Sequence, residues 1–297
     1  MKKNTLIGRP ALTTAVATIF VLAAVTLQAT PTSPKAPAPA SAVLEYKMPT
    51  GRTLTYQSKS EETQVMEVMG QSMDTHATNN STVTFKAKGP KDNNLLLGVS
   101  IDEMAASFTS SAAGDMSPDM SSLKGKTFDM VLSALGSEID VSAAEAIKYD
   151  MAGATRNIAS GFKMFFPDLP DKPVKVGDTW PSNAGIDEDM GEIKMRLDFK
   201  NVNTLEGFET VDGLECARVS TAVTGTLTGS GNQQGMDMTF AGTTKGKETW
   251  YFAIKEGLFI KSASETTTEM SIDVPAAGMT IPATATAKAE VKLTAKQ

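Results

Sequence analysis

Residues 193–200 read IKMRLDFK, and this stretch decides the fold. Four apolar residues alternate with four charged ones, so an extended chain here has one apolar face and one charged face. This period of two is typical of a strand in a sheet that has one face in water. The same alternation recurs at residues 95–101, 217–223 and 285–293, which predicts a protein built mainly from strands.

Turn signals connect these strands. Residues 250–254 read WYFAI and residues 258–260 read LFI, with Lys-Glu-Gly between them. Glycine adopts the positive φ that a tight turn needs, so we expect a hairpin at Gly257. Glycines also gather at 229–235, where no helical pattern follows. We interpret that stretch as a second hairpin tip, because a phosphate-binding loop needs a helix N-terminus behind it.

Residues 143–166 show a different pattern. Ile158, Phe162 and Phe165 recur at spacings of four and three, which is typical of one face of a helix. Pro167 ends the segment. We expect one or two short helices packed on the sheet, with a lid over a cavity as the alternative.

Two parts of the chain carry similar short motifs. Residues 51–54 resemble 177–180, and residues 124–128 resemble 245–250, at nearly equal separations. Such spacing indicates two similar units in one chain.

The predicted fold class is therefore α+β and mostly β, with long antiparallel strands in one or two strongly curved, half-barrel-like sheets. We expect one β-rich domain at 43–297. It would contain two similar β units, at about 43–142 and 172–297, joined by a helical connector at 143–171.

The N-terminal residues 1–29 have the features of a secretory signal peptide. Three basic residues lie within the first nine positions, an uncharged and largely apolar run follows, and Ala29 is a small residue at the expected cut. A membrane-anchoring helix is the alternative, because the run is near the lower length limit for a span. The single cysteine, Cys216, lies far from the cut, so we do not expect a lipoprotein.

Residues 30–42 contain four prolines, which predicts an extended tether outside the core. We thus expect an exported protein, periplasmic or extracellular, without a stable transmembrane anchor once the signal is cleaved. The net charge of −6 argues against nucleic acid as a partner. At 41% hydrophobic residues the chain can bury a sizeable core without disulfides.

The residues for common catalytic and metal sites are absent from the sequence. His76 is the only histidine, so neither a Ser/His/Asp triad elsewhere nor a zinc site of His and Cys can be assembled. We expect His76 to be solvated and Cys216 to be a small apolar residue that is buried or half-buried. The acidic run at 187–192 lacks the spacing of a calcium loop and predicts a solvated turn. We expect no enzyme activity, no cofactor and no metal.

Methionine is abundant, with 17 residues. Flexible thioethers fill gaps in a core that is poor in aromatic residues, and they also line adaptable ligand cavities. A third interpretation is Cu(I) binding by thioethers outside the cytoplasm, although no histidine or second cysteine supports it.

Several motifs are similar to those of bacterial exported proteins that are grouped only as a domain of unknown function. They are FFPDLP at 165–170, VGDTW at 176–180, GLECA at 213–217 and GKETWYF at 246–252. The resemblance covers about 43–297. The architecture also resembles the lipoprotein-carrier half-barrels, which hold acyl chains in a curved sheet. Neither resemblance implies a functional residue for this chain.

We therefore expect an exported, non-catalytic protein that binds or carries an apolar ligand such as a lipid or lipopeptide. Phe162, Phe165, Phe166 and Trp180 are the candidate rim of its cavity. The alternative is a structural or protein-interaction domain of the cell envelope, whose partner is an envelope protein. A hydrolase that uses paired carboxylates is a third hypothesis.

Overall fold

The computed structural model describes residues 41–111, 114–151, 154–233 and 235–297. The predicted signal peptide at 1–29 lies outside the described residues, as does most of the predicted tether at 30–42. Ala42 is already part of the fold, because its backbone pairs with that of Val174 in an isolated bridge. No helix in the described ranges has the length and hydropathy for a membrane span.

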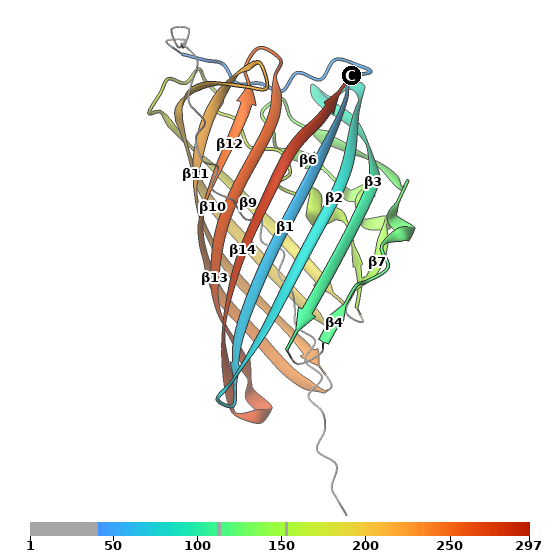
Figure 1. Ribbon diagram of the computed structural model, residues 1–297, viewed down its shortest axis with the longest axis vertical. Helices are drawn as coiled ribbons and strands as arrows, with labels where there is room; N and C mark the ends of the chain where they lie inside the picture. Colours follow the sequence, from blue (N-terminus) through green and yellow to red (C-terminus); the bar gives the residue numbers. More distant parts are fainter. Residues whose placement is uncertain (1–40, 112–113, 152–153, 234) are drawn as a thin grey trace, which may run out of the picture.

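The fold is mostly β, as predicted, with 71% of the described residues in strands and 6% in helical turns. One curled antiparallel sheet dominates the structure (Figure 1). In order across the sheet its strands are β6 (Glu138–Asp140), β5 (Thr127–Leu132), β3 (Asn94–Ser110), β2 (Gln71–Lys91), β1 (Thr53–Val68), β14 (Met279–Lys296), β13 (Leu258–Val274), β12 (Met236–Ala253), β11 (Leu214–Gln233), β10 (Ile193–Val211) and β9 (Thr179–Met190). A short strand, β4 (Gly114–Met116), pairs with β3.

The two halves of the chain join in the middle of this sheet. Strand β1 pairs with β14 over a long antiparallel register that runs from Leu54 opposite Lys296 to Met66 opposite Ala283. Residues predicted to form two β units therefore lie in one continuous sheet. The internal similarity of the two units stays a prediction.

The predicted strand at 193–200 is confirmed, since its residues alternate between buried and exposed along β10. Both predicted hairpins are also present. The turn after Ala253 contains Gly257 with a φ of 66°, and the tip between β11 and β12 contains Gly235 with a φ of 81°.

Among its described residues, the connector at 143–171 is helical only in two short 3₁₀ turns, η2 (Ser142–Ala146) and η3 (Ala159–Phe162). Further turns of this kind are η1 (Ser121–Leu123) and η4 (Pro275–Ala277). Between η2 and η3 the chain forms a separate hairpin, β7 (Lys148–Met151) with β8 (Ala154–Asn157). The expected α-helical stripe is thus not formed. Its apolar residues reach a common core from irregular backbone instead of from one helix face.

Inward-facing glycines allow the sheet to curl tightly. A Cβ atom at Gly242 on β12 would lie 2.7 Å from the carbonyl oxygen of Glu269 on β13, and one at Gly231 on β11 would lie 2.7 Å from that of Glu192. Neighbouring strands can approach this closely only where the side chain is missing. Glycine at these two positions therefore permits the close approach of neighbouring strands in the curled sheet.

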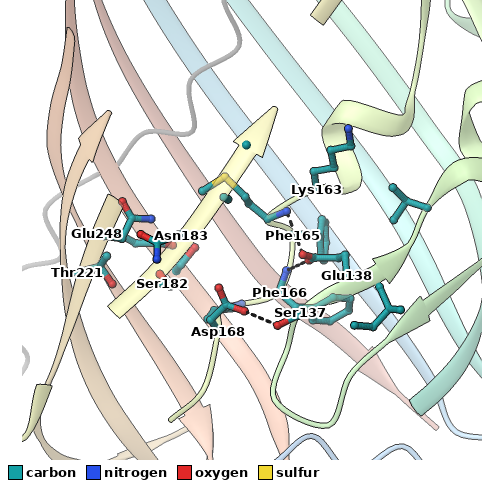
Figure 2. A pocket seen from close by; sticks show the side chains of 18 of the residues that line it. Ser137, Glu138, Lys163, Phe165, Phe166, Asp168, Ser182, Asn183, Thr221 and Glu248 are labelled. Atoms are coloured by element: carbon teal, nitrogen blue, oxygen red, sulfur yellow. Dashed lines mark hydrogen bonds between the residues drawn. The ribbon is translucent and has the colours of Figure 1, made fainter. Parts of the chain in front are cut away.

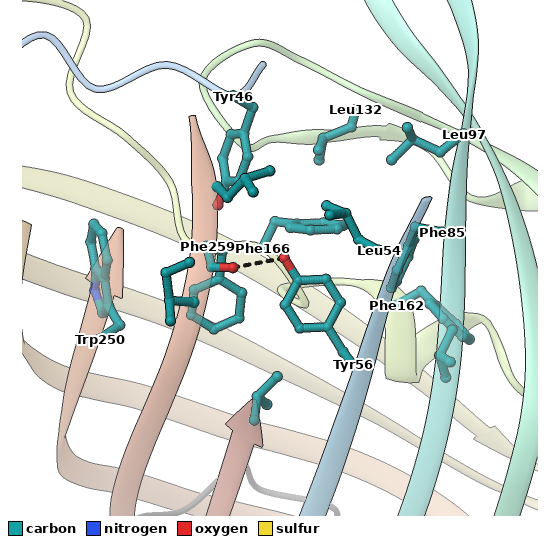
Figure 3. Packing of buried hydrophobic residues seen from close by; sticks show 14 of the residues in the cluster. Tyr46, Leu54, Tyr56, Phe85, Leu97, Leu132, Phe162, Phe166, Trp250 and Phe259 are labelled. Atoms are coloured by element: carbon teal, nitrogen blue, oxygen red, sulfur yellow. Dashed lines mark hydrogen bonds between the residues drawn. The ribbon is translucent and has the colours of Figure 1, made fainter. Parts of the chain in front are cut away.

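Two apolar clusters occupy the interior. The larger one surrounds Tyr56, whose hydroxyl donates a 2.8 Å hydrogen bond to the carbonyl of Phe259, and it includes Phe85 and Phe166 (Figure 3). The second cluster lies further along β10 to β14. It contains Phe199, Leu227, Phe240 and the buried methionines Met66, Met190, Met195 and Met270. These four methionines pack in a core, as the gap-filling interpretation predicts.

Candidate functional site

A cavity of about 480 Å³ lies where the two edges of the sheet face each other. Residues 137–142 of the β6 side and residues 182–185 of β9 line it from the two edges. Residues 163–168, here called the strap, lie between them. Inward side chains of β10 to β13 form the remaining wall. Figure 2 shows Glu248, Thr221 and Ser182 on one side of this seam cavity, and Glu138 and Phe166 on the other.

The strap is held by polar contacts to both edges. Glu138 accepts hydrogen bonds from two strap amides, from Phe166 at 3.0 Å and from Met164 at 3.3 Å. The Ser137 hydroxyl donates to the Asp168 carboxylate at 3.1 Å, and the Trp180 indole N–H donates to the Asp168 carbonyl at 2.9 Å. The strap thus occupies the position that a further strand would take between β6 and β9.

A row of polar side chains crosses four strands, and three of its members, Asn203, Thr221 and Glu248, line the cavity. Asn203 of β10 is opposite Thr221 of β11, which is opposite Glu248 of β12, which in turn is opposite Ser264 of β13. Directly opposed residues on neighbouring strands share a face and lie about 5 Å apart. This polar row therefore presents adjacent hydrogen-bonding groups.

Buried hydrogen bonds fix the orientation of the polar row. The Thr221 hydroxyl accepts a hydrogen bond from the Trp250 indole N–H at 3.0 Å and donates one to Asn203 Oδ1 at 2.6 Å. Because Asn203 Oδ1 is the acceptor, its Nδ2 must be a donor. That Nδ2 atom has no hydrogen-bond partner in the described part of the chain, although Asn203 is only 3% exposed.

A second polar atom is in the same situation. Asn201 lies two residues before Asn203 on the same face of β10 and is 8% exposed. Its Oδ1 atom also lacks a partner among the described residues. Both asparagines line the seam cavity. Burial of unpaired amide atoms costs free energy, so a pair of them in a cavity wall marks a place where a ligand can supply the missing hydrogen bonds.

Burial shifts the pKa values of the cavity carboxyl groups upward. It raises the pKa of Glu138 to about 8, even though the two strap amides favour the ionised form. It raises the pKa of Glu248 to about 7, against the opposing hydrogen bond from Ser262. The pKa of Asp168 is raised for the same reason, against the hydrogen bond from Ser137. Perturbed carboxyl groups in a cavity are typical of a functional site.

The structure separates the four aromatic residues predicted for the rim. Phe165 and Phe166 line the seam cavity. Phe162 lies in the core instead, with its ring centroid 4.8 Å from that of Phe128. Trp180 packs edge-on against Trp250 at 6.1 Å and is not among the residues that line the cavity.

The polar half of the wall was missed by sequence reasoning, although the sequence contains a usable signal. Asn201 and Asn203 continue the apolar phase of 193–199 along β10, and Glu248 has the same phase as Trp250 on β12. A polar residue in the inward phase of a long strand points to a polar interior.

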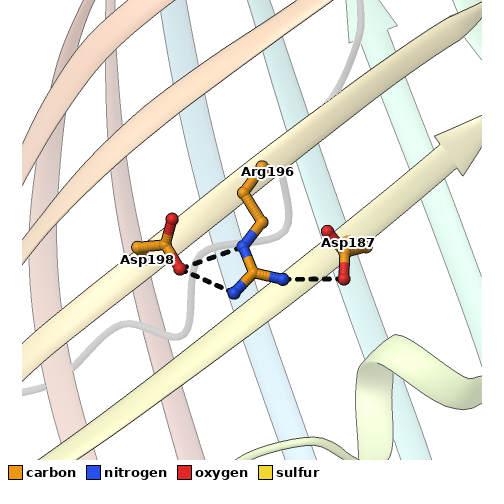
Figure 4. Close-up of polar contacts among 3 residues, drawn as sticks. All are labelled: Asp187, Arg196 and Asp198. Carbon is orange, nitrogen blue, oxygen red and sulfur yellow. Dashed lines mark hydrogen bonds and ion pairs between the residues drawn. The ribbon is translucent and has the colours of Figure 1, made fainter.

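The remaining candidate residues lie away from the cavity. Cys216 is fully buried, as predicted, and burial raises its thiol pKa to about 12. His76 is exposed, as predicted, with its ring 3.3 Å from the Thr63 hydroxyl. The acidic run was predicted to be a solvated turn, but its residues 187–190 belong to β9, and only Gly191 and Glu192 form the turn before β10. Arg196 of β10 pairs with Asp187 of β9 at 2.8 Å and with Asp198 at 2.7 Å (Figure 4).

No group of three or more metal-ligating His, Cys, Asp or Glu residues occurs within the described ranges. No protein-family model matches the chain. No curated protein matches it either.

Two solved structures are similar to this chain at a low level. A DUF1329 family protein from Desulfovibrio piger has a TM-score of 0.18 and 10% identity, over 81% of this chain and 85% of that one. Pseudomonas aeruginosa OccK11 (OpdR) has a TM-score of 0.20 and 7% identity, over 85% of this chain and 100% of that one. TM-scores this low carry no argument about function.

Proposed function

We propose that this chain is an exported, non-catalytic protein that binds or carries a small amphiphilic molecule in the seam cavity. The observation that carries the proposal is the pair of buried amide atoms, Asn201 Oδ1 and Asn203 Nδ2, that line a cavity without hydrogen-bond partners among the described residues. The volume of about 480 Å³ is within the range of small-molecule sites.

The two sides of the cavity differ in polarity, which suggests how a ligand is oriented. The strap side offers Met164, Phe165 and Phe166, and the β6 side adds Ile139 and Val141. The opposite wall offers the polar row. An apolar body would pack against the strap while a polar end reaches Asn203 and Glu248. This refines the expected apolar ligand, such as a lipid or lipopeptide, by giving its polar end a place in the cavity.

A carboxylate-based hydrolase has less support. Both oxygens of Glu138 accept backbone amides of the strap, which gives this residue a structural task. Paired-carboxylate hydrolysis needs two acids that are free to act on one substrate. The interaction-domain alternative also has less support, because the exposed large apolar residues of the described chain come singly from several different strands and turns.

Native mass spectrometry of protein purified from its own envelope tests the proposal directly. We expect a co-purifying small molecule that is lost from Ala184→Trp, because Ala184 lines the cavity and a large side chain there would fill it. Asp189→Trp is the control, since Asp189 is exposed further along the same strand. The proposal fails if the wild type carries no ligand and, after extraction of lipids, binds no alkyl probe.

A further inference from the structure

The cavity wall has an excess of hydrogen-bond acceptors over donors. Asn201 Oδ1 is a buried acceptor without a partner among the described residues, and the Glu248 carboxylate lies on the neighbouring polar row. Among the described residues that line the cavity, Asn203 Nδ2 is the one buried side-chain donor without a partner. A ligand end that satisfies this wall must therefore donate more hydrogen bonds than it accepts.

The charge of the cavity lining also favours a ligand end that donates hydrogen bonds. Five acidic residues line the cavity, namely Glu138, Asp140, Glu145, Asp168 and Glu248, and the single basic residue is Lys163. Lys163 also interacts electrostatically with Glu188, whose carboxyl group does not line the cavity. Burial raises the pKa of Glu188, and Ser160, Arg156 and Lys163 oppose that rise. Even with Glu138 largely protonated near pH 7, as its raised pKa implies, acidic groups outnumber Lys163, so the lining disfavours an anionic ligand head and favours a cation.

Glu248 is the acidic residue best placed to meet such a cation. It lies on β12 between Thr221 and Ser264 in the polar row, and Ser262 donates a hydrogen bond to it. Unlike Glu138, it does not bind the strap amides. A carboxylate in this position can pair with an ammonium group inside the cavity.

We infer that the ligand is a cationic amphiphile, with an amine that binds Glu248 and Asn201 Oδ1 and a neighbouring hydroxyl or carbonyl oxygen that accepts a hydrogen bond from Asn203 Nδ2. This inference rests on the proposed function and specifies the chemical class of its ligand. The amine supplies the donors that the wall lacks, and the neighbouring oxygen supplies the one acceptor that it needs.

Three probes that share one alkyl chain test the head-group chemistry: decylamine, decanol and decanoate. Binding to lipid-extracted protein is measured by calorimetry and by the fluorescence of Trp250, which lines the cavity, at concentrations below micelle formation. We expect decylamine to bind at least about tenfold more tightly than decanol, since a hydrogen bond to a charged group is the stronger kind. Decanoate should bind more weakly than decanol.

Substitutions of Glu248 and Asn203 test whether these two residues of the cavity wall cause the head-group preference. Glu248→Gln keeps the shape of the side chain and should weaken decylamine about tenfold while leaving decanol unchanged. Glu269→Gln is the matched control, because Glu269 is exposed on the neighbouring strand β13. An amino alcohol with the same chain should bind about fivefold more tightly than decylamine, and Asn203→Ala should remove that gain.

The outcomes separate this inference from the proposed function. If decanoate binds as tightly as decylamine, or if Glu248→Gln weakens decanol and decylamine equally, the amine inference is wrong and a binding function survives. If none of the three probes binds to the wild type, both proposals fail. Thermal unfolding of each variant identifies any loss of binding that follows from loss of the fold.

Discussion

Glu138 on β6 accepts a 3.0 Å hydrogen bond from the backbone N–H of Phe166 in the strap. The edge of a sheet usually offers its own backbone groups to a partner. Here a side chain binds the backbone of the neighbouring segment, so the strap can follow an irregular path. That path includes Met164 with a φ of 72°. The strap therefore closes one side of the cavity without becoming a strand.

Replacing Glu138 should loosen the strap. Glu138→Ala removes the acceptor for two backbone amides, and we expect it to lower the free energy of unfolding by about 1–3 kcal/mol. Hydrogen exchange at the amides of Met164 and Phe166 should become faster. Ser137→Ala should lower the free energy of unfolding by less, because it removes a single exposed hydrogen bond to Asp168. Unchanged exchange at both amides would show that Glu138 does not hold the strap.

Stability should fall as the pH rises from about 5 to about 8. The pKa values of Glu138 and Glu248 are raised from 4.5 to about 8 and about 7, so in this window the folded chain binds more protons than the unfolded chain. Raising the pH then favours the unfolded state. Asp168, whose pKa is also raised, adds to the same trend.

Thermal unfolding at several pH values measures this effect. The double variant Glu138→Gln and Glu248→Gln should show a flatter dependence of Tm on pH than the wild type. A wild-type Tm that increases steadily between pH 5 and pH 8 would contradict the raised pKa values.

Thr221 links the buried tryptophan to the polar row, and its hydroxyl should matter for stability. Thr221→Val keeps the side-chain shape but leaves the Trp250 N–H without its acceptor and Asn203 Oδ1 without its donor. We expect a loss of about 1–3 kcal/mol in urea unfolding. Thr226→Val, at an exposed position of the same strand, should change stability by less than about 0.5 kcal/mol. Equal effects of the two variants would rule out a special role for the Thr221 hydroxyl.

The curl of the sheet should depend on its inward glycines. Gly242→Ala places a Cβ atom 2.7 Å from the Glu269 carbonyl oxygen and 2.8 Å from Met270 Cβ, and backbone on β13 cannot give way cheaply. We expect a loss of at least about 2 kcal/mol. Gly207→Ala provides the comparison, because open space surrounds that position on β10. If denaturant unfolding gives both variants the same stability, close approach of β12 and β13 is not what requires glycine at 242.

The strands were predictable from sequence because their signal is local. Alternation along 193–200 and the turn glycine at 257 each act within a few residues, and both predictions are confirmed. The helical prediction failed because spacing alone does not distinguish a helix from irregular backbone that delivers Ile158 and Phe162 to one core. The polar wall depends on contacts between strands distant in sequence. Asn203 and Glu248 become neighbours of Thr221 only once the register of β10, β11 and β12 is known.

The β1–β14 pair has a consequence for the order of folding. Neighbouring strands on either side of it follow one another along the chain, so hairpins can form each half soon after its residues leave the ribosome. The pair itself joins residues as far apart as Thr55 and Thr294, which are separated by 239 positions. Closing so long a loop is slow. Until it closes, β1 and β14 each present an unpaired edge, and this is the interval in which a nascent chain most needs protection from pairing with other chains.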